Sequence, residues 1–166
     1  MKNTIYILLL IFATSSCKIK YGFKGVSIPI EAKSISVAFF QNNSAMASPV
    51  EAQKFTEKLR DMVSSQTNLA LVKQNGDLQF EGFIADYTIT PVAIQSTDQA
   101  ALNRLTISVN VKYSNKFDAT KNFEQSFSRF ADYQSNQTLS SIEAGLMEEI
   151  NRQLTEDIFN KAFNNW

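Results

Sequence analysis

Every second residue between Arg104 and Tyr113 is apolar, and the residues between them are polar. The apolar set is Leu105, Ile107, Val109, Val111 and Tyr113. The polar set is Arg104, Thr106, Ser108, Asn110 and Lys112. A period of two is that of a β-strand with one buried face and one solvated face. The chain is therefore expected to build a sheet of which only one face is covered.

Three other segments have the residue pattern of strands. Residues 33–40 alternate, and the apolar face comprises Ile35, Val37 and Phe39. Residues 78–94 are rich in Phe, Tyr, Ile and Thr, and their apolar phase slips near Gly82, which predicts a β-bulge. Residues 122–133 form the last predicted strand. Its apolar side comprises Phe123, Phe127, Ala131 and Tyr133.

Two segments have the signature of helices that cover a sheet. Residues 48–51, Ser-Pro-Val-Glu, combine a capping box with Pro at the first helical position, and an apolar stripe follows to about Gln66. Residues 140–143 form a second capping box, and a longer stripe runs from there to about Ala162. Both stripes are one-sided, so each helix needs an apolar surface to pack on.

These elements predict an α+β fold in the order β-α-β-β-β-α. We expect a two-layer sandwich with a four-stranded, mostly antiparallel sheet and both helices packed on one face. The opposite face, which carries Thr106, Ser108 and Asn110, would then remain uncovered and polar. Such a face is either simply solvated, as in many antiparallel two-layer domains, or it meets a polar partner surface.

Charge and residue usage narrow the possible functions. Sixteen Lys and Arg balance sixteen Asp and Glu, which argues against a nucleic-acid binder. With no His and one Cys, the chain has neither a His-based nucleophile pair nor a His- or thiolate-ligated metal site. Glu81 and Asp86, the acid and base that an anchored hydrolase would need, project from opposite faces of a regular strand, although a bulge could bring them to one face. We expect no catalytic residue, no metal and no cofactor.

The N-terminus has the layout of an export signal. Lys2 is followed by an apolar run over residues 5–12, too short to span a bilayer, and by small residues ahead of Cys17. This arrangement resembles the bacterial lipoprotein signal, which implies cleavage before Cys17 and its acylation with chains such as palmitate. The alternative is an ordinary signal peptide that leaves Cys17 a free thiol. We predict a signal peptide over residues 1–16, a lipidated tether over 17–32 and one domain over 33–166.

Four stretches of the mature chain resemble a family of bacterial envelope lipoproteins. They are residues 21–25 (YGFKG), 34–40 (SISVAFF), 77–82 (DLQFEG) and 123–130 (FEQSFSRF). With the lipoprotein signal and the predicted order of elements, they are similar to the Bacteroidetes branch of the LPS-assembly lipoprotein family, LptE. The resemblance extends over essentially the whole mature chain. It depends on arrangement and on scattered aromatic and Gly positions rather than on catalytic residues.

That resemblance implies a non-enzymatic lipoprotein anchored in the outer membrane on its periplasmic side. It would sit in the lumen of an LptD-type β-barrel, plug the barrel, assist its assembly and help deliver lipopolysaccharide to the outer leaflet. A polar sheet face suits the polar interior of a barrel. The candidate barrel-facing residues are Thr106, Ser108 and Asn110. Basic residues could bind the phosphates of lipopolysaccharide, and the candidates are Arg104, Lys112, Lys116 and Lys121.

Another function stays open at this point. The protein could be a periplasm-facing lipoprotein adaptor that binds another envelope protein or a small ligand through the same sheet face. The two functions differ in whether the partner is an outer-membrane barrel. The aromatic residues near the C-terminus, Phe159, Phe163 and Trp166, similarly either close the core or contact a partner.

Overall fold

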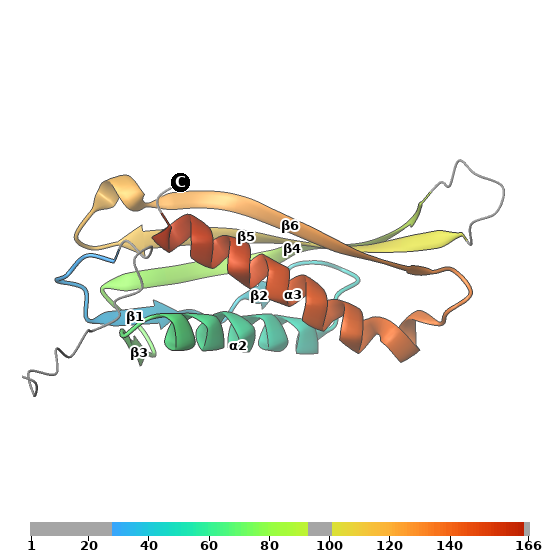
Figure 1. The fold of residues 1–166 in the computed structure, drawn as a ribbon, viewed down its shortest axis with the longest axis horizontal. Coiled ribbons are helices and arrows are strands. Elements are labelled where there is room, and N and C mark those ends of the chain that lie inside the picture. The colour runs from blue at the N-terminus through green and yellow to red at the C-terminus, as the bar shows by residue number, and fades with distance from the viewer. Residues whose placement is uncertain (1–27, 93–100, 165–166) are drawn as a thin grey trace, which may run out of the picture.

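The structure is a computed structural model, and it describes residues 28–92 and 101–164 (Figure 1). In chain order, its elements are β1 (Ser34–Val37), β2 (Gln41–Asn42), α2 (Pro49–Gln66), β3 (Ala70–Val72), β4 (Leu78–Val92), β5 (Leu102–Asn115), the 3₁₀ turn η1 (Ala119–Lys121), β6 (Phe123–Gln134) and α3 (Leu139–Phe163). The predicted signal peptide, Cys17 and most of the predicted tether lie outside the described residues. Within the described ranges, neither helix has both the length and the apolarity needed to cross a membrane.

The described strands form one mixed sheet in the order β3-β1-β4-β5-β6, and β2 pairs with β4. β1 runs parallel to β3 and β4, whereas β4, β5 and β6 form an antiparallel meander. The predicted α+β class with two helices is confirmed. The predicted four-stranded, mostly antiparallel sheet and its element order are wrong, because the described sheet has six strands. The chain passes through α2 between β1 and β4, and a crossover of this kind returns a strand in the parallel direction.

Both helices lie on the same side of the sheet (Figure 1). Two side chains that point from the sheet toward α3 show this for α3. The Tyr87 hydroxyl donates to Glu143 Oε1 at 2.5 Å, and the Arg129 guanidinium donates to both carboxylate oxygens of Asp157 at 2.5 and 2.8 Å. The apolar face predicted for residues 104–113 is fully buried beneath the helices. The core therefore lies between one sheet face and the helix pair.

The first strand departs from its predicted alternation. Ile35 and Val37 are buried as expected, but Phe39 is 53% exposed and Phe40 is fully buried. Val37 pairs with Phe80 and Gln41 pairs with Phe83, so the stretch from Val37 to Gln41 contains one residue more than the matching stretch of β4. This extra residue separates β1 from β2 and reverses which side chains point inward. Phe40 consequently points inward and meets Phe55 of α2 edge-on, with ring centroids 5.1 Å apart.

The sequence predicted the N-terminal cap of α2 correctly but not that of α3. Ser48 caps α2 by accepting a hydrogen bond from Val50 N at 3.3 Å, and Pro49 occupies the first turn, as predicted. Glu51 does not complete the capping box, because its side chain is buried against α3. The capping box predicted at residues 140–143 is also wrong: α3 begins at Leu139, and its N-cap, Thr138, makes no side-chain cap bond.

Gly82 lies where β4 comes very close to its neighbours. The register shift in β4 lies between Ile84 and Asp86, slightly beyond the bulge predicted near Gly82. Gly82 is needed for a different reason. A Cβ at this position would lie 2.0 Å from the Asn110 carbonyl oxygen and 2.6 Å from Phe40 Cε1. The strand and the inward-turned Phe40 ring can therefore pack only against a residue without a side chain.

Replacing Gly82 by alanine is expected to lower the free energy of unfolding by about 2–3 kcal/mol, because a methyl group there overpacks the site. Gly145→Ala is the matched control, since a Cβ at Gly145 meets no atom within 4 Å and Ala favours the helix. Urea denaturation of the two variants should give effects of opposite sign. Equal stability of Gly82→Ala and the unmodified protein would show that β4 and β5 can move apart at no cost.

Candidate interaction face

The sheet surface opposite the helices is formed by the outward residues of β4, β5 and β6, which we call the open face. In an antiparallel sheet, residues directly opposite one another project to the same side, so the register defines this face. Three rows cross its centre. They are Thr88-Thr106-Phe130, Asp86-Ser108-Ser128 and Phe83-Asn110-Ser126. The structure thus brings the predicted barrel-facing residues Thr106, Ser108 and Asn110 together on one surface.

The centre of the open face is polar but tightly organised. Thr106, Ser108 and Asn110 are each half-buried among neighbouring strands, and the Ser108 and Ser128 hydroxyls are hydrogen-bonded at 3.0 Å. The register adds two aromatic residues, Phe83 and Phe130, that the sequence analysis did not connect with this face. The outward parity of Phe130 was readable from the sequence, whereas the bulge predicted near Gly82 would have turned Phe83 inward, and the register shift beyond Ile84 leaves it outward. The face therefore offers hydroxyls and amides between two aromatic rings.

Arg104 is held in place at one end of the open face. Its Nε and Nη2 donate to the two carboxylate oxygens of Asp132 at 2.7 and 2.9 Å, and its guanidinium lies 3.6 Å from the Phe130 ring centroid. The bidentate hydrogen bond raises the pKa of Arg104 and lowers that of Asp132. To bind an external phosphate, Arg104 would have to share its donors with Asp132 or exchange partners.

The other predicted basic residues lie toward the opposite end of β5. Lys112 lies between Glu81 and Glu124 in the register, and its Nζ is 3.8 Å from Glu81. Lys116 is 3.6 Å from Asp77. Lys121 ends η1 and lines a hollow of about 380 Å³ beside the turn.

The four candidate lipopolysaccharide contacts do not form a single cluster. Arg104 and Lys116 are twelve positions apart along an extended stretch of chain, which corresponds to about 40 Å at roughly 3.4 Å per residue. Lys116 and Lys121, by contrast, belong to the same β5–β6 turn. A single anionic group could therefore contact the turn or Arg104, but not both.

A buried polar pair connects the two helices and was not predicted from the sequence. Asn151 Nδ2 donates to Glu51 Oε1 at 2.7 Å, while Glu51 Oε2 and Asn151 Oδ1 have no hydrogen-bond partner. Both residues are almost inaccessible to solvent. Burial raises the pKa of Glu51, against smaller opposing effects of the Asn151 hydrogen bond and Lys54, and nearby Glu143 raises it further. The capping-box pattern at residues 48–51 had suggested a different role for Glu51.

This raised pKa predicts a pH dependence of stability. A carboxyl group whose pKa is higher in the folded state binds its proton more tightly there, so its contribution to stability is largest below the unfolded-state pKa. That contribution falls as the pH rises from about 4.5 to the folded-state pKa of Glu51. Several paired carboxylates with lowered pKa values act in the opposite direction and are lost in acid. The difference in unfolding free energy between the unmodified protein and Glu51→Gln isolates the Glu51 effect and should shift in favour of Gln with increasing pH.

Metal chemistry has no obvious location on the described surface. Within residues 28–92 and 101–164, no group of three or more Cys, Asp or Glu side chains is arranged to hold a metal ion. Glu81 and Asp86, considered above as an acid and base, lie in different rows of the open face, opposite Lys112 and Ser108 respectively. The bulge between them brings both to one face, contrary to the simple alternation of a regular strand.

Comparison with known proteins identifies both a family and a fold. The model of the LptE family, described as lipopolysaccharide-assembly, matches residues 32–162. No curated protein matches the chain closely enough to count as a relative. Similar solved structures include a minor lipoprotein from Acinetobacter baumannii, with 13% identity, a TM-score of 0.51, and coverage of 78% of this chain and 91% of that one. Rare lipoprotein B from Shewanella oneidensis has 15% identity, a TM-score of 0.52, and coverage of 75% and 91%. At these identities, the structures establish the shared fold.

Proposed function

Because the chain belongs to the LptE lipopolysaccharide-assembly family, we propose that it is an outer-membrane lipoprotein that sits in the lumen of an LptD-type β-barrel. There it plugs the barrel, assists its assembly and takes part in delivering lipopolysaccharide to the outer leaflet. The family is one of non-enzymatic assembly proteins, and the proposed role requires no catalytic residue. Family membership makes the chain a lipopolysaccharide-assembly protein, and the barrel-plug role is the finer step proposed here.

The observation that carries this proposal is the open face. Three neighbouring antiparallel strands present hydroxyl and amide side chains there, and no described element covers them. Arg104 and Lys112 are each paired with a carboxylate, and Asp86 and Glu124 add two further acidic groups, so the face carries more acidic than basic side chains. A barrel lumen is lined by the inward, polar residues of its strands, and a polar face is complementary to such a wall.

The test is a mild-detergent pull-down from cell envelopes with a C-terminal tag on the intact lipoprotein. Photo-crosslinkers placed at Thr106, Ser108 and Asn110 should attach to a large barrel protein. A crosslinker at Gln53, exposed on α2, is the matched control and should give much less product. If no barrel is recovered and these positions crosslink instead to another envelope protein, the adaptor function replaces the plug.

Lipid attachment at Cys17 is the second part of the proposal, and it concerns a residue outside the described ranges. Changing Cys17 to Ser is expected to move the protein from the membrane fraction to the soluble fraction, because several acyl chains are needed for stable anchoring. Fractionation followed by mass spectrometry of the N-terminal peptide measures both location and acylation. If the Cys17→Ser protein remains membrane-bound in cells that lack the barrel partner, the anchor is elsewhere.

Contact with lipopolysaccharide is proposed for the basic residues already named. Lys116 and Lys121 share a turn and form the more compact pair, whereas Arg104 and Lys112 lie at separate places along β5. We therefore expect Lys116→Gln together with Lys121→Gln to weaken lipopolysaccharide binding more than Arg104→Gln does. Binding of purified lipopolysaccharide to the tagged protein, measured for each variant, ranks these contributions.

A further inference from the structure

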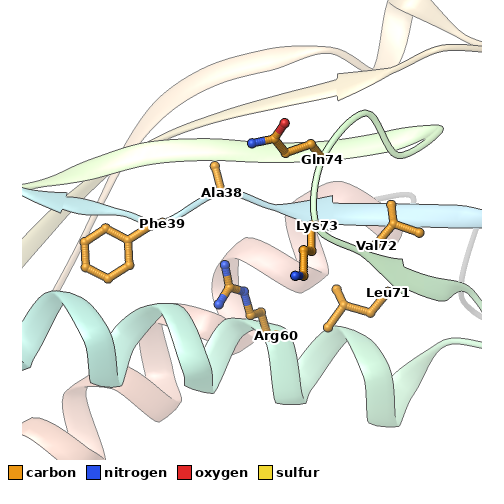
Figure 2. Close-up of a pocket in the computed structure, with 7 residues that line it drawn as sticks. All are labelled: Ala38, Phe39, Arg60, Leu71, Val72, Lys73 and Gln74. Atoms are coloured by element: carbon orange, nitrogen blue, oxygen red, sulfur yellow. The ribbon is translucent and has the colours of Figure 1, made fainter.

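A cleft opens on the edge of the sheet, where β3 ends beside α2 (Figure 2). Its volume is about 550 Å³, within the range of small-molecule sites. It is lined by residues 71–74, by Arg60 of α2, and by Ala38 and Phe39 of the segment that carries the extra residue. None of the lining side chains is acidic. The cleft is separate from the open face, which lies on β4, β5 and β6.

Arg60 differs from the other arginines in the described part of the chain. Those three, Arg104, Arg129 and Arg152, are each bound to carboxylates. Arg60 instead donates from Nε and Nη2 to the Val37 carbonyl oxygen, at 3.2 and 2.8 Å. These bonds fix the guanidinium in orientation, and among the described residues they leave its charge without a counter-ion and its Nη1 hydrogens available. A cation held in this way is organised in advance to bind an anion.

The remaining lining supplies a second cation and an apolar surface. The Lys73 side chain lies in the same cleft as Arg60 (Figure 2), and it forms no ion pair within the described residues. Phe39 and Leu71 are 53% and 43% exposed, a large fraction for apolar side chains. Two cations beside two apolar side chains fit a ligand with an anionic head and a hydrocarbon tail.

The cleft lies at the end of the domain where the described chain begins. Val37, at its rim, pairs with Phe80 near the start of β4, and Ile28 and Pro29 lie beside the β5–β6 turn at the same end. Residues 17–27 lie between the predicted anchor and the described chain. Eleven residues can span at most about 40 Å. A chain anchored at Cys17 therefore holds this end of the domain within about 40 Å of the membrane surface.

We propose that the cleft binds an anionic glycerophospholipid of the leaflet that holds the anchor. Arg60 and Lys73 bind the phosphate, and Phe39 and Leu71 contact the upper part of an acyl chain. The proposal rests on the proposed function only for the location of the anchor. Because β3 is the outer strand here, a peptide strand could extend the sheet at the cleft only beside β1, where Arg60 already donates to the Val37 carbonyl. The lipid phosphate needs only the donors that Arg60 leaves open.

The experiment uses the full mature chain with Cys17→Ser, which removes the anchor so that binding reports the cleft alone. Co-sedimentation is measured with vesicles of phosphatidylcholine and with vesicles that also contain phosphatidylglycerol. The protein should bind the second kind. Lys73→Gln and Arg60→Gln should each weaken binding about fivefold, the change expected for one cation at an anionic surface, and the double variant about 25-fold. Leu71→Ser should also weaken binding.

Lys161→Gln is the matched control, because it removes the same charge from an exposed site near the end of α3 and should change binding less than twofold. An equal loss in this control would mean that net charge, not the cleft, attracts the vesicles and would overturn the proposal. Equal binding to both kinds of vesicle would overturn it as well. So would displacement by inorganic phosphate alone, or Arg60-dependent binding of lipopolysaccharide without binding of phosphatidylglycerol. Lys73 is exposed, so its variant should remain folded by circular dichroism, and none of these outcomes affects the barrel pull-down.

Discussion

Replacing Asn151 by leucine should lower the free energy of unfolding by about 3 kcal/mol, the largest loss we expect from a single polar position. Asn151 provides the only hydrogen bond to the Glu51 carboxyl group among the described residues, and Glu51 is fully buried. Without it, the carboxyl group remains in the protein interior with no partner. Urea denaturation at neutral pH measures the loss.

Two companion variants distinguish the loss of the hydrogen bond between Glu51 and Asn151 from a change in packing at the same place. A protonated Glu51 could donate from Oε2 to the unpartnered Asn151 Oδ1 and complete a two-bond pair, and the amide of Glu51→Gln can do the same. Glu51→Gln should therefore be at least as stable as the unmodified protein. Glu51→Leu combined with Asn151→Leu should recover most of the loss, because both polar groups are then absent. If Asn151→Leu alone is neutral, Glu51 has another partner in solution.

Replacing Phe163 by alanine should cost about 3–5 kcal/mol, because the side chain fills the junction between the end of α3 and the sheet. Phe163 is 1% exposed. Its ring meets those of Phe80, Tyr113 and Phe159 at centroid distances of 6.1, 5.9 and 4.8 Å. Truncation leaves a cavity that rigid strands cannot close. The midpoint of urea denaturation should fall accordingly.

The matched control is Phe117→Ala, since Phe117 is 43% exposed beside the β5–β6 turn. Its effect on stability should be within about 0.5–1 kcal/mol. The contrast also bears on the C-terminal aromatic residues. Phe159 and Phe163 are buried, as expected if the C-terminal aromatic residues close the core. Trp166 lies outside the described residues. A small effect of Phe163→Ala would instead favour a partner contact for this end of the chain.

The parts of the fold that follow local rules could be predicted from the sequence. β5 alternates without interruption, and both of its predicted faces are correct. The start of α2 is fixed by Ser48 and Pro49, whose effects are confined to one turn. β3 has only three residues, and its pairing with β1 depends on where α2 returns the chain. Nothing in those three residues determines that pairing, and β2 has only two residues, so the strand count was wrong.

The errors in the candidate sites have a related cause. Phe39 and Phe40 are adjacent aromatic residues, and a strand pattern alone cannot locate the extra residue that turns Phe40 inward. Residue parity placed Thr106, Ser108 and Asn110 on one face, but Arg104 was considered without Asp132, its partner across 28 positions of the chain. Arg60 was not singled out from the sequence, because its cleft forms where β3 and α2 come together. Patterns along the chain predict faces, whereas sites arise from the register between distant segments.

The mixed sheet also has a consequence for how the protein folds. The pairs β4–β5 and β5–β6 join segments that follow one another along the chain, whereas Ile35 reaches Leu78 across 43 positions and the whole of α2. Contacts across long stretches of chain form later, because closing the loop costs entropy first. We expect the meander to fold before β1 docks, so β4, central in the native sheet, is temporarily a bare outer strand. An unpaired strand is a template for association with other chains. The protein is thus most prone to aggregate before its N-terminal strand is in place.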